Sequence, residues 1–138
     1  MSAPKPIHAV PSTVDTEPAP KPRTGLVVIE SPYAGNRRRN AADLAACMRD
    51  SFARGEAPYA SHALYTQYLD DDVPAERELG IEAGLAWGAK ADLTSAYVDL
   101  GVSPGMRVGI ERAKAEGRAV EFRTVSGWVW PAKNEGGK

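Results

Sequence analysis

Short apolar runs alternate along the chain with longer stretches in which apolar residues recur every three or four positions. The first run, Leu26–Ile29, is rich in β-branched residues and has no polar alternation, as expected of a central strand covered on both faces. The segment Ser31–Gly35 then interrupts the pattern with small residues and proline. Similar runs predict a short strand at the start of 57–65, a third strand over 93–98 and a fourth over 118–124.

The first helical pattern follows the break at Ser31–Gly35. Asn40 is expected to cap this helix, with Asp43 three residues later as in a capping box, and Gly55 is expected to end it. The apolar residues recur at spacings of three and four and therefore predict one buried face. That face comprises Leu44, Cys47, Met48 and Phe52.

Two further helices are predicted between the later strands. One starts near Val73-Pro74, because proline suits a first turn, and runs to about Lys90. The other starts at Ser103 as N-cap, with Pro104 at the first helical position, and stops at Gly117. The expected buried faces are Leu79, Ala83, Ala86 and Trp87 in the former helix and Met106, Ile110 and Ala113 in the latter.

This alternation of strands and helices predicts an α/β fold. Right-handed crossovers make all the strands parallel and place helices on both faces of the sheet. We therefore expect a small three-layer domain, flavodoxin-like or Rossmann-like, with about four strands in the order 2-1-3-4. In such sheets the ligand lies outside the carboxyl ends of the strands.

Composition divides the chain into three parts. Residues 1–24 hold six of the eleven prolines and are expected to form a disordered Pro/Ala-rich leader. The α/β domain is expected over 25–126 and a C-terminal extension over 127–138, in which Trp128-Val129-Trp130 is expected to lie across the sheet edge.

Charge and cysteine content narrow the classes of function. A formal net charge of −1 argues against general DNA or RNA binding, and the basic run Arg37–Arg39 is too short to change this. The single cysteine, Cys47, excludes a disulfide within the chain and a multi-cysteine metal site, and inert core packing is favoured over a nucleophilic role. No cofactor or metal is expected. No apolar run approaches a membrane span and no secretory signal is evident, so a cytoplasmic location is expected.

The loops after the first three predicted strands open on the same sheet edge and carry the candidate ligand contacts. Each of these residues also has a plain structural interpretation, since serine and glycine make turns and Ser103 caps a helix. Their convergence carries more weight than any single member. The residues are Ser31, Tyr33, Gly35, Ser61, His62, Asp99, Gly101, Ser103 and Gly105.

Several of these side chains suit a sugar–base ligand. The helix start at Ser103 is expected to offer backbone N–H groups to an anion, and Gly105 permits close approach. Tyr33 can stack on a base, and Asp99 can accept hydrogen bonds from sugar hydroxyls. His62 can act as an acid or base or can hydrogen-bond a backbone carbonyl, and both interpretations stay open. A surface role for the arginine run is favoured over phosphate binding.

Four short motifs carry a resemblance to a known family. They are Val-Val-Ile-Glu-Ser-Pro-Tyr-Ala-Gly at 27–35, Ala-Asp at 91–92, Asp-Leu-Gly-Val-Ser-Pro-Gly-Met at 99–106 and Gly-Ile-Glu-Arg-Ala at 109–113. With them the chain resembles the nucleoside 2-deoxyribosyltransferase superfamily. It looks closest to a bacterial and phage branch described as a domain of unknown function.

The resemblance implies exchange of a base on a deoxyribose through a glutamate that attacks the anomeric carbon. Asp92 and Asp99 match the family's aspartates, Tyr33 its base-side aromatic, and Met106 belongs to the motif of the substrate loop. The family glutamate follows the Gly-Met pair closely, but Arg107 stands directly after Met106 in this chain. The candidate nucleophiles are therefore Glu111, further along the helix, and Glu30 at the end of the first strand.

Two hypotheses of function follow, and a third is weaker. The protein cleaves or exchanges the N-glycosidic bond of a nucleoside or nucleotide, with Asp92, Asp99 and His62 assisting the nucleophile. Alternatively, it is a non-catalytic nucleotide-binding module, a sensor or sequestering protein, on the same scaffold. A structural subunit with a vestigial site is the third possibility. The resemblance also implies a homo-oligomer.

Overall fold

A computed structural model describes residues 25–125 and contains one four-stranded sheet. All the strands are parallel and their order is β2-β1-β3-β4, which confirms the predicted 2-1-3-4 arrangement. The central strands are β1 (Leu26–Glu30) and β3 (Leu93–Tyr97), and the edge strands are β2 (Ala57–Tyr59) and β4 (Ala119–Arg123). Val27 pairs with Leu93, which fixes the register of the two central strands.

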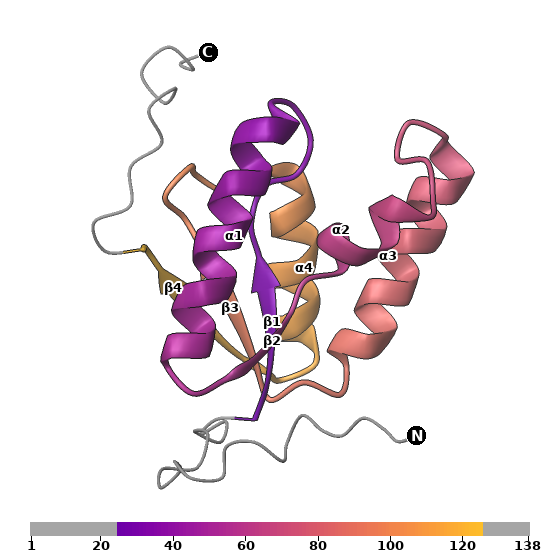
Figure 1. Cartoon of the computed structure of the whole chain (residues 1–138). Helices are drawn as coiled ribbons and strands as arrows, with labels where there is room; N and C mark the ends of the chain where they lie inside the picture. Colours follow the sequence, from indigo (N-terminus) through magenta and orange to yellow (C-terminus); the bar gives the residue numbers. More distant parts are fainter. Residues whose placement is uncertain (1–24, 126–138) are drawn as a thin grey trace, which may run out of the picture.

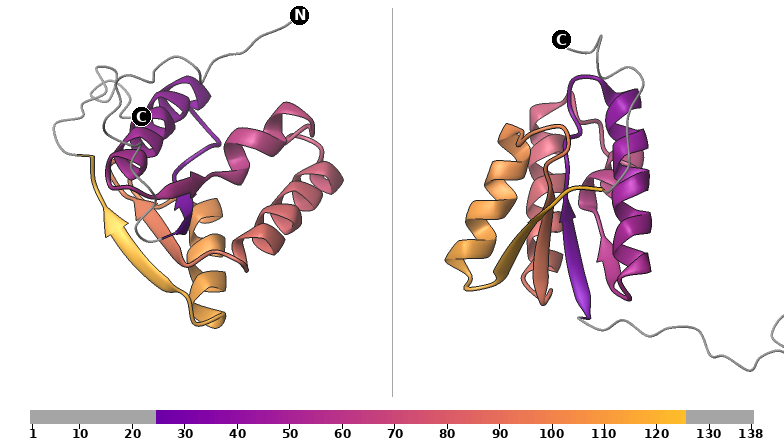
Figure 2. Two further views of the ribbon diagram at one scale, coloured as in Figure 1. Left: turned by 60° about the horizontal axis from the view of Figure 1, so that its bottom comes forward. Right: turned by 90° about the vertical axis from the view of Figure 1, so that its left-hand side faces the viewer.

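The three long helices lie on both faces of this sheet. They are α1 (Arg37–Ala53), α3 (Pro74–Gly88) and α4 (Pro104–Ala115). Figure 1 and both views of Figure 2 show α1 on one face, with α3 and α4 on the other. Two short helical segments, α2 (Ser61–Leu64) and η3 (Tyr65–Gln67), connect β2 to α3. The result is the predicted three-layer α/β domain.

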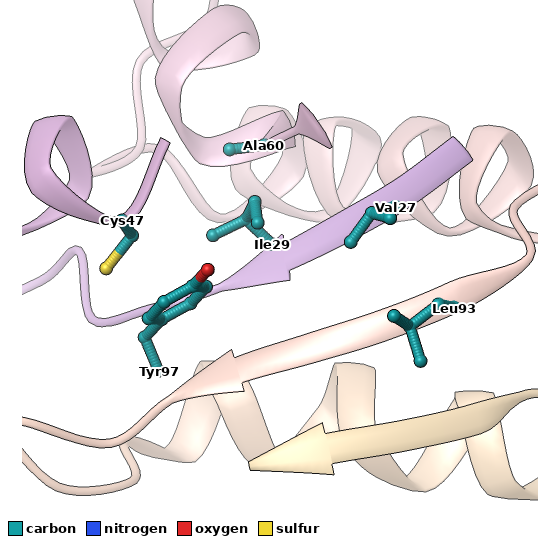
Figure 3. Close-up of a cluster of buried hydrophobic side chains, with 6 residues drawn as sticks. All are labelled: Val27, Ile29, Cys47, Ala60, Leu93 and Tyr97. Carbon is teal, nitrogen blue, oxygen red and sulfur yellow. The ribbon is translucent and has the colours of Figure 1, made fainter. Parts of the chain in front are cut away.

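The larger hydrophobic core lies between α1 and the sheet. Figure 3 shows its buried side chains, which come from both central strands, from α1 and from the residue after β2. They are Val27, Ile29, Cys47, Ala60, Leu93 and Tyr97. On the opposite face a smaller cluster of Ala96, Met106 and Ile110 packs α4 against the sheet, which confirms the predicted buried face of that helix.

Alternation along β1 determines which of its side chains reach each face. Val27 and Ile29 are buried on the α1 side. Because successive residues of a strand point to opposite faces, Val28 and Glu30 lie on the side of α3 and α4. The end of β1 therefore carries a carboxyl group into the space between these two helices.

The start of α1 differs from the prediction. The N-cap is Asn36, whose side chain accepts a hydrogen bond from the Arg39 N–H at 3.0 Å, so the cap lies four residues before the expected one. Asn40 is instead buried within the helix and donates from Nδ2 to the backbone carbonyls of Tyr33 and Ala34, each at 2.9 Å. Asn40 therefore fixes the loop after β1. The predicted buried Phe52 is 60 % exposed.

The predicted apolar stripe of α3 is also wrong. The helix starts at Pro74 as expected, but Leu79 and Trp87 are 59 % and 65 % exposed. The residues that α3 buries are Gly84 and Gly88. The spacing of apolar residues did not predict this face, because glycine has no side chain and is not counted as an apolar residue.

The predictions of a leader over 1–24 and of a C-terminal extension over 127–138 lie outside the described residues. Within the described part of the chain, no helix combines the length and the apolar character needed to cross a bilayer.

Candidate functional site

A cavity of about 430 Å³ lies between α3, α4 and the face of β1. We call it the α3–α4 pocket. It opens where the loops after β1, β2 and β3 meet, which is the edge at which ligands bind in parallel α/β sheets. Its polar lining includes Glu30, Ser31, Tyr33, His62, Ser103 and Arg118, with Tyr59, Ser61, Tyr65, Thr66, Asp71, Glu76 and Arg77 around them.

The two helices that border the pocket present glycine to it. Gly80, Gly84 and Gly88 recur at four-residue spacing on α3, and all three line the cavity. A Cβ atom added at Gly84 would lie 2.6 Å from the side chain of Ser61, so this glycine also lets α2 approach α3 closely. Gly109 has the equivalent position on α4. Larger residues on these faces would fill the space that a ligand needs.

Glu30 is the central ionisable group of the pocket. Burial raises the pKa of its carboxyl from 4.5 to about 8, and the positive charge of Arg118 opposes this rise only in part. The Glu30 carboxyl forms no hydrogen bond or ion pair with another residue of the described chain. A Cβ atom at Gly109 would overlap Glu30 Oε2 and lie 2.5 Å from Cδ, so the carboxyl rests directly on the backbone of α4. At neutral pH this group is mostly a carboxylic acid that can donate a proton.

Ser31 and His62 form a polar pair beside Glu30. Ser31 Oγ and His62 Nε2 are hydrogen-bonded at 2.9 Å, and burial lowers the pKa of the imidazole to about 4. The His62 backbone carbonyl accepts a hydrogen bond from the Thr66 hydroxyl at 2.8 Å, which holds the segment after β2 in place. The ring is therefore neutral at physiological pH, and it meets Tyr33 edge-on with centroids 6.5 Å apart.

The mouth of the pocket is bounded by an exposed ionic contact. The guanidinium of Arg37 lies 5.0 Å from the centre of the Tyr33 ring and bonds Asp72 at 3.1 Å. Both charged side chains are well exposed, so their contact contributes little to stability. This contact links the start of α1 to the loop before α3 across the rim.

The start of α4 offers fewer donors to an anion than predicted. Ser103 is the N-cap as expected, but its hydroxyl accepts the Met106 N–H at 3.2 Å, and its own N–H points to the Met106 sulfur at 3.4 Å. Pro104 has no N–H. Among the first residues of this helix, only Gly105 keeps an N–H that no acceptor in the described chain occupies. A single donor makes a weak phosphate site.

Seven of the residues expected at the site do line the pocket. They are Ser31, Tyr33, Ser61, His62, Ser103, Gly105 and Met106. Three loops distant in sequence therefore meet around one cavity, as the topology predicted. Glu30, which the sequence offered as the second candidate nucleophile, lines it as well.

The structure does not bring the other expected residues to the pocket. Glu111 is exposed on α4, since it follows the pocket-facing Gly109 by two residues and so points to another side of the helix. Asp92 lies at the opposite edge of the sheet, where its carboxylate accepts the Leu26 N–H at 2.8 Å and pins the start of β1. Glu111 and Asp92, both expected as catalytic residues, therefore lie outside the α3–α4 pocket.

Asp99, Gly35 and Gly101 also lie outside the pocket. Asp99 follows β3 on the α1 side and accepts the Val125 N–H at 3.0 Å, so it fixes the end of β4. Gly35 and Gly101 are exposed turn residues with φ of +94° and +90°, and neither lines the pocket. Glycine suits both positions because the backbone there is left-handed, and neither residue contacts the pocket.

Cys47 lies in the core, as the favoured interpretation predicted. Burial, with the negative charge of Asp43 adding to it, raises the pKa of the Cys47 thiol far above its usual range, so the group stays protonated. Among the described residues, no group of three or more histidine, cysteine, aspartate or glutamate side chains is arranged to hold a metal ion.

Sequence reasoning missed the inner end of the pocket. Arg118 was expected only as the first residue of the fourth strand, yet its guanidinium lines the cavity. The glycine face of α3 was missed for the reason given above. The spacing of Gly80, Gly84 and Gly88 was the signal available in the sequence.

The fold and the pocket define a small parallel α/β domain with a ligand cavity at the carboxyl ends of its strands. The chain belongs to the family DUF7768, a domain of unknown function, and the match covers residues 25–123. A comparison with curated proteins found no match.

Proposed function

We propose that this protein binds a nucleoside or nucleotide in the α3–α4 pocket and cleaves or exchanges its N-glycosidic bond. The observation that carries the proposal is Glu30, a carboxyl group with no partner in the described chain, held at the carboxyl edge of the sheet inside a 430 Å³ cavity. The resemblance to nucleoside 2-deoxyribosyltransferases supports the reaction class. The hydroxyl and aromatic groups around Glu30 suit a sugar and a base.

The chemistry of Glu30 follows from its surroundings. A carboxylic acid with a pKa of about 8 is protonated at neutral pH and can donate its proton to a ring nitrogen of the departing base. The C1′–N bond then breaks with its electron pair going to the base. The carboxylate that remains then bonds to the cationic C1′ on the face that the base has left, and a second base or water later displaces it. One side chain thus serves as acid and then as nucleophile.

The neighbouring residues have supporting roles in this scheme. Ser31 and the neutral His62 offer hydrogen bonds to the sugar from the side next to Glu30. Tyr33 offers an aromatic surface at the mouth of the pocket. Gly109 leaves the space in which the carboxyl sits. None of these roles needs a metal ion or a cofactor.

The test is base exchange by the full chain. The protein is incubated with a 2′-deoxynucleoside and a different free base, and the products are separated by chromatography. Loss of an acid catalyst typically costs about 10²–10⁴ in rate, so Glu30→Gln should lower turnover by that factor. Glu111→Gln is the matched control, because it removes an exposed carboxyl from α4 outside the pocket and should leave turnover unchanged. Equal activity of Glu30→Gln and wild type would refute the assignment.

One observation favours a second candidate function, a non-catalytic nucleotide-binding module. The helix carboxylate implied by the resemblance, Glu111, does not reach the pocket. Calorimetry with the same nucleosides separates the two hypotheses. Binding without base release or exchange would support the binding module and exclude the enzyme.

A further inference from the structure

Arg118 places a buried cation at the inner end of the α3–α4 pocket. Its side chain is only 6 % exposed. Nε donates to the Thr94 hydroxyl at 3.0 Å and Nη1 donates to Glu116 at 2.7 Å, so the plane of the guanidinium is fixed from two sides. A donor held in this way has a defined direction and loses little freedom when a ligand binds.

The remaining nitrogen, Nη2, faces the cavity. It lies 3.8 Å from the position that a Cβ atom would take at Gly88, on the glycine face of α3. No acceptor for Nη2 is present in the described chain, and no ion pair joins Arg118 to Glu30. Because Arg118 lines the cavity, Nη2 is free to donate to an acceptor that a ligand brings there.

The charges around the pocket favour a neutral acceptor over an anion. Arg118 and Arg77, the two cations that line the cavity, already pair with Glu116 and with Asp71. Glu76 adds a further acidic group on the same lining. A phosphate would find no surplus positive charge here. A neutral carbonyl oxygen can accept a hydrogen bond from Nη2 and does not need surplus positive charge around it.

We propose that Arg118 donates a hydrogen bond from Nη2 to a keto oxygen of the base, so that the pocket prefers 6-oxopurine to 6-aminopurine nucleosides. This inference rests on the proposed function, since it assumes that a nucleoside enters with its base innermost. A 6-amino group would place its own N–H donor opposite the Nη2 donor of Arg118, so no hydrogen bond could form between them. A site built to hydrogen-bond one substituent discriminates strongly against an analogue that presents the wrong partner.

Calorimetric titration of the full chain with 2′-deoxyinosine and 2′-deoxyadenosine tests the inference, because the two differ only in the 6-substituent and in the proton on the adjacent N1. Wild type should bind deoxyinosine at least about tenfold more tightly. Arg118→Met should reduce the ratio to less than about twofold, because methionine keeps the apolar stem and removes the donor. Arg112→Met is the matched control, since Arg112 also pairs with Glu116 but lies outside the pocket, and it should keep the preference.

Each outcome of these titrations supports or overturns the proposed role of Arg118. Equal binding of the two nucleosides to wild type overturns the role of Arg118, and if Glu30→Gln still abolishes turnover the proposed function survives. Binding of neither nucleoside overturns both. Binding of inorganic phosphate to wild type that Arg118→Met abolishes would replace the keto assignment with an anion site. If Arg118→Met does not fold, Arg118→Lys provides the comparison, because a lysine cannot bond Thr94 and the ligand with fixed geometry, and the preference should fall.

Discussion

Glu30→Gln should change the pH dependence of stability in a way that no exposed glutamate can. In the native state the pKa of Glu30 is raised from 4.5 to about 8, with burial as the main cause. Between these two pH values the unfolded chain has lost the proton and the native chain still holds it. Stability contributed by protonated Glu30 is therefore fully present below pH 4.5 and is lost progressively as pH rises toward 8.

The size of the effect follows from the gap between the two pKa values. Each pH unit within the gap corresponds to about 1.4 kcal/mol, so the loss across the whole window is on the order of 5 kcal/mol. Glutamine has nearly the same shape and does not ionise. The variant should match wild type near pH 4.5 and exceed it by several kcal/mol at pH 8.

Urea denaturation of the two proteins at a series of pH values from 4.5 to 8.5 measures the difference in the free energy of unfolding. Other titrations, including that of His62, occur in both proteins and cancel. Glu111→Gln, which removes an exposed carboxyl outside the pocket, is the control. A difference for Glu30→Gln that does not change between pH 5 and 8 would show that the carboxyl is hydrated, and it would remove the case for an acid at neutral pH.

Two further predictions concern the packing around the site and the sheet. Gly109→Ala should destabilise the protein by about 1–3 kcal/mol and lower Glu30-dependent base release, because the new Cβ overlaps the carboxyl; Gly105→Ala, which meets open space, is the control for stability. Arg123→Met should cost about 3–5 kcal/mol in thermal or urea unfolding, since it leaves the buried carboxylate of Glu56 without its partner at 2.7 Å. The double variant Arg123→Met/Glu56→Met should recover most of that loss, and a purely additive result would contradict a buried ion pair.

The architecture could be predicted because its signals are local and repeated. The apolar run Leu26–Ile29 became β1, and Ser103 with Pro104 began α4 as predicted. The strand order followed from the handedness of the crossovers. These features depend on a few neighbouring residues and on general rules of chain connection, so a single sequence is enough to find them.

The composition of the pocket depends on side-chain direction, which the sequence reports less well. Glu111 and Gly109 are two residues apart on α4, and that spacing turns one away from the cavity when the other faces it. Asp92 lies just before β3 and therefore falls at the opposite edge from the loops that follow the strands. The motif resemblance assigned roles to Asp92, Asp99 and Glu111 without considering the direction in which each side chain points.

Three features that weaken the fold meet in the α3–α4 pocket, and their meeting is the strongest argument that the pocket binds something. Gly80 and Gly84 inside α3 each cost about 0.8–1.0 kcal/mol relative to alanine in a helix. Glu30 is a carboxyl without a partner in the described chain, and Arg118 holds a donor without an acceptor there. Sequences that specify one fold break local rules mainly where function requires it. A ligand that occupies the glycine-lined space and bonds both polar groups would give Glu30 and Arg118 the partners that they lack in the described chain.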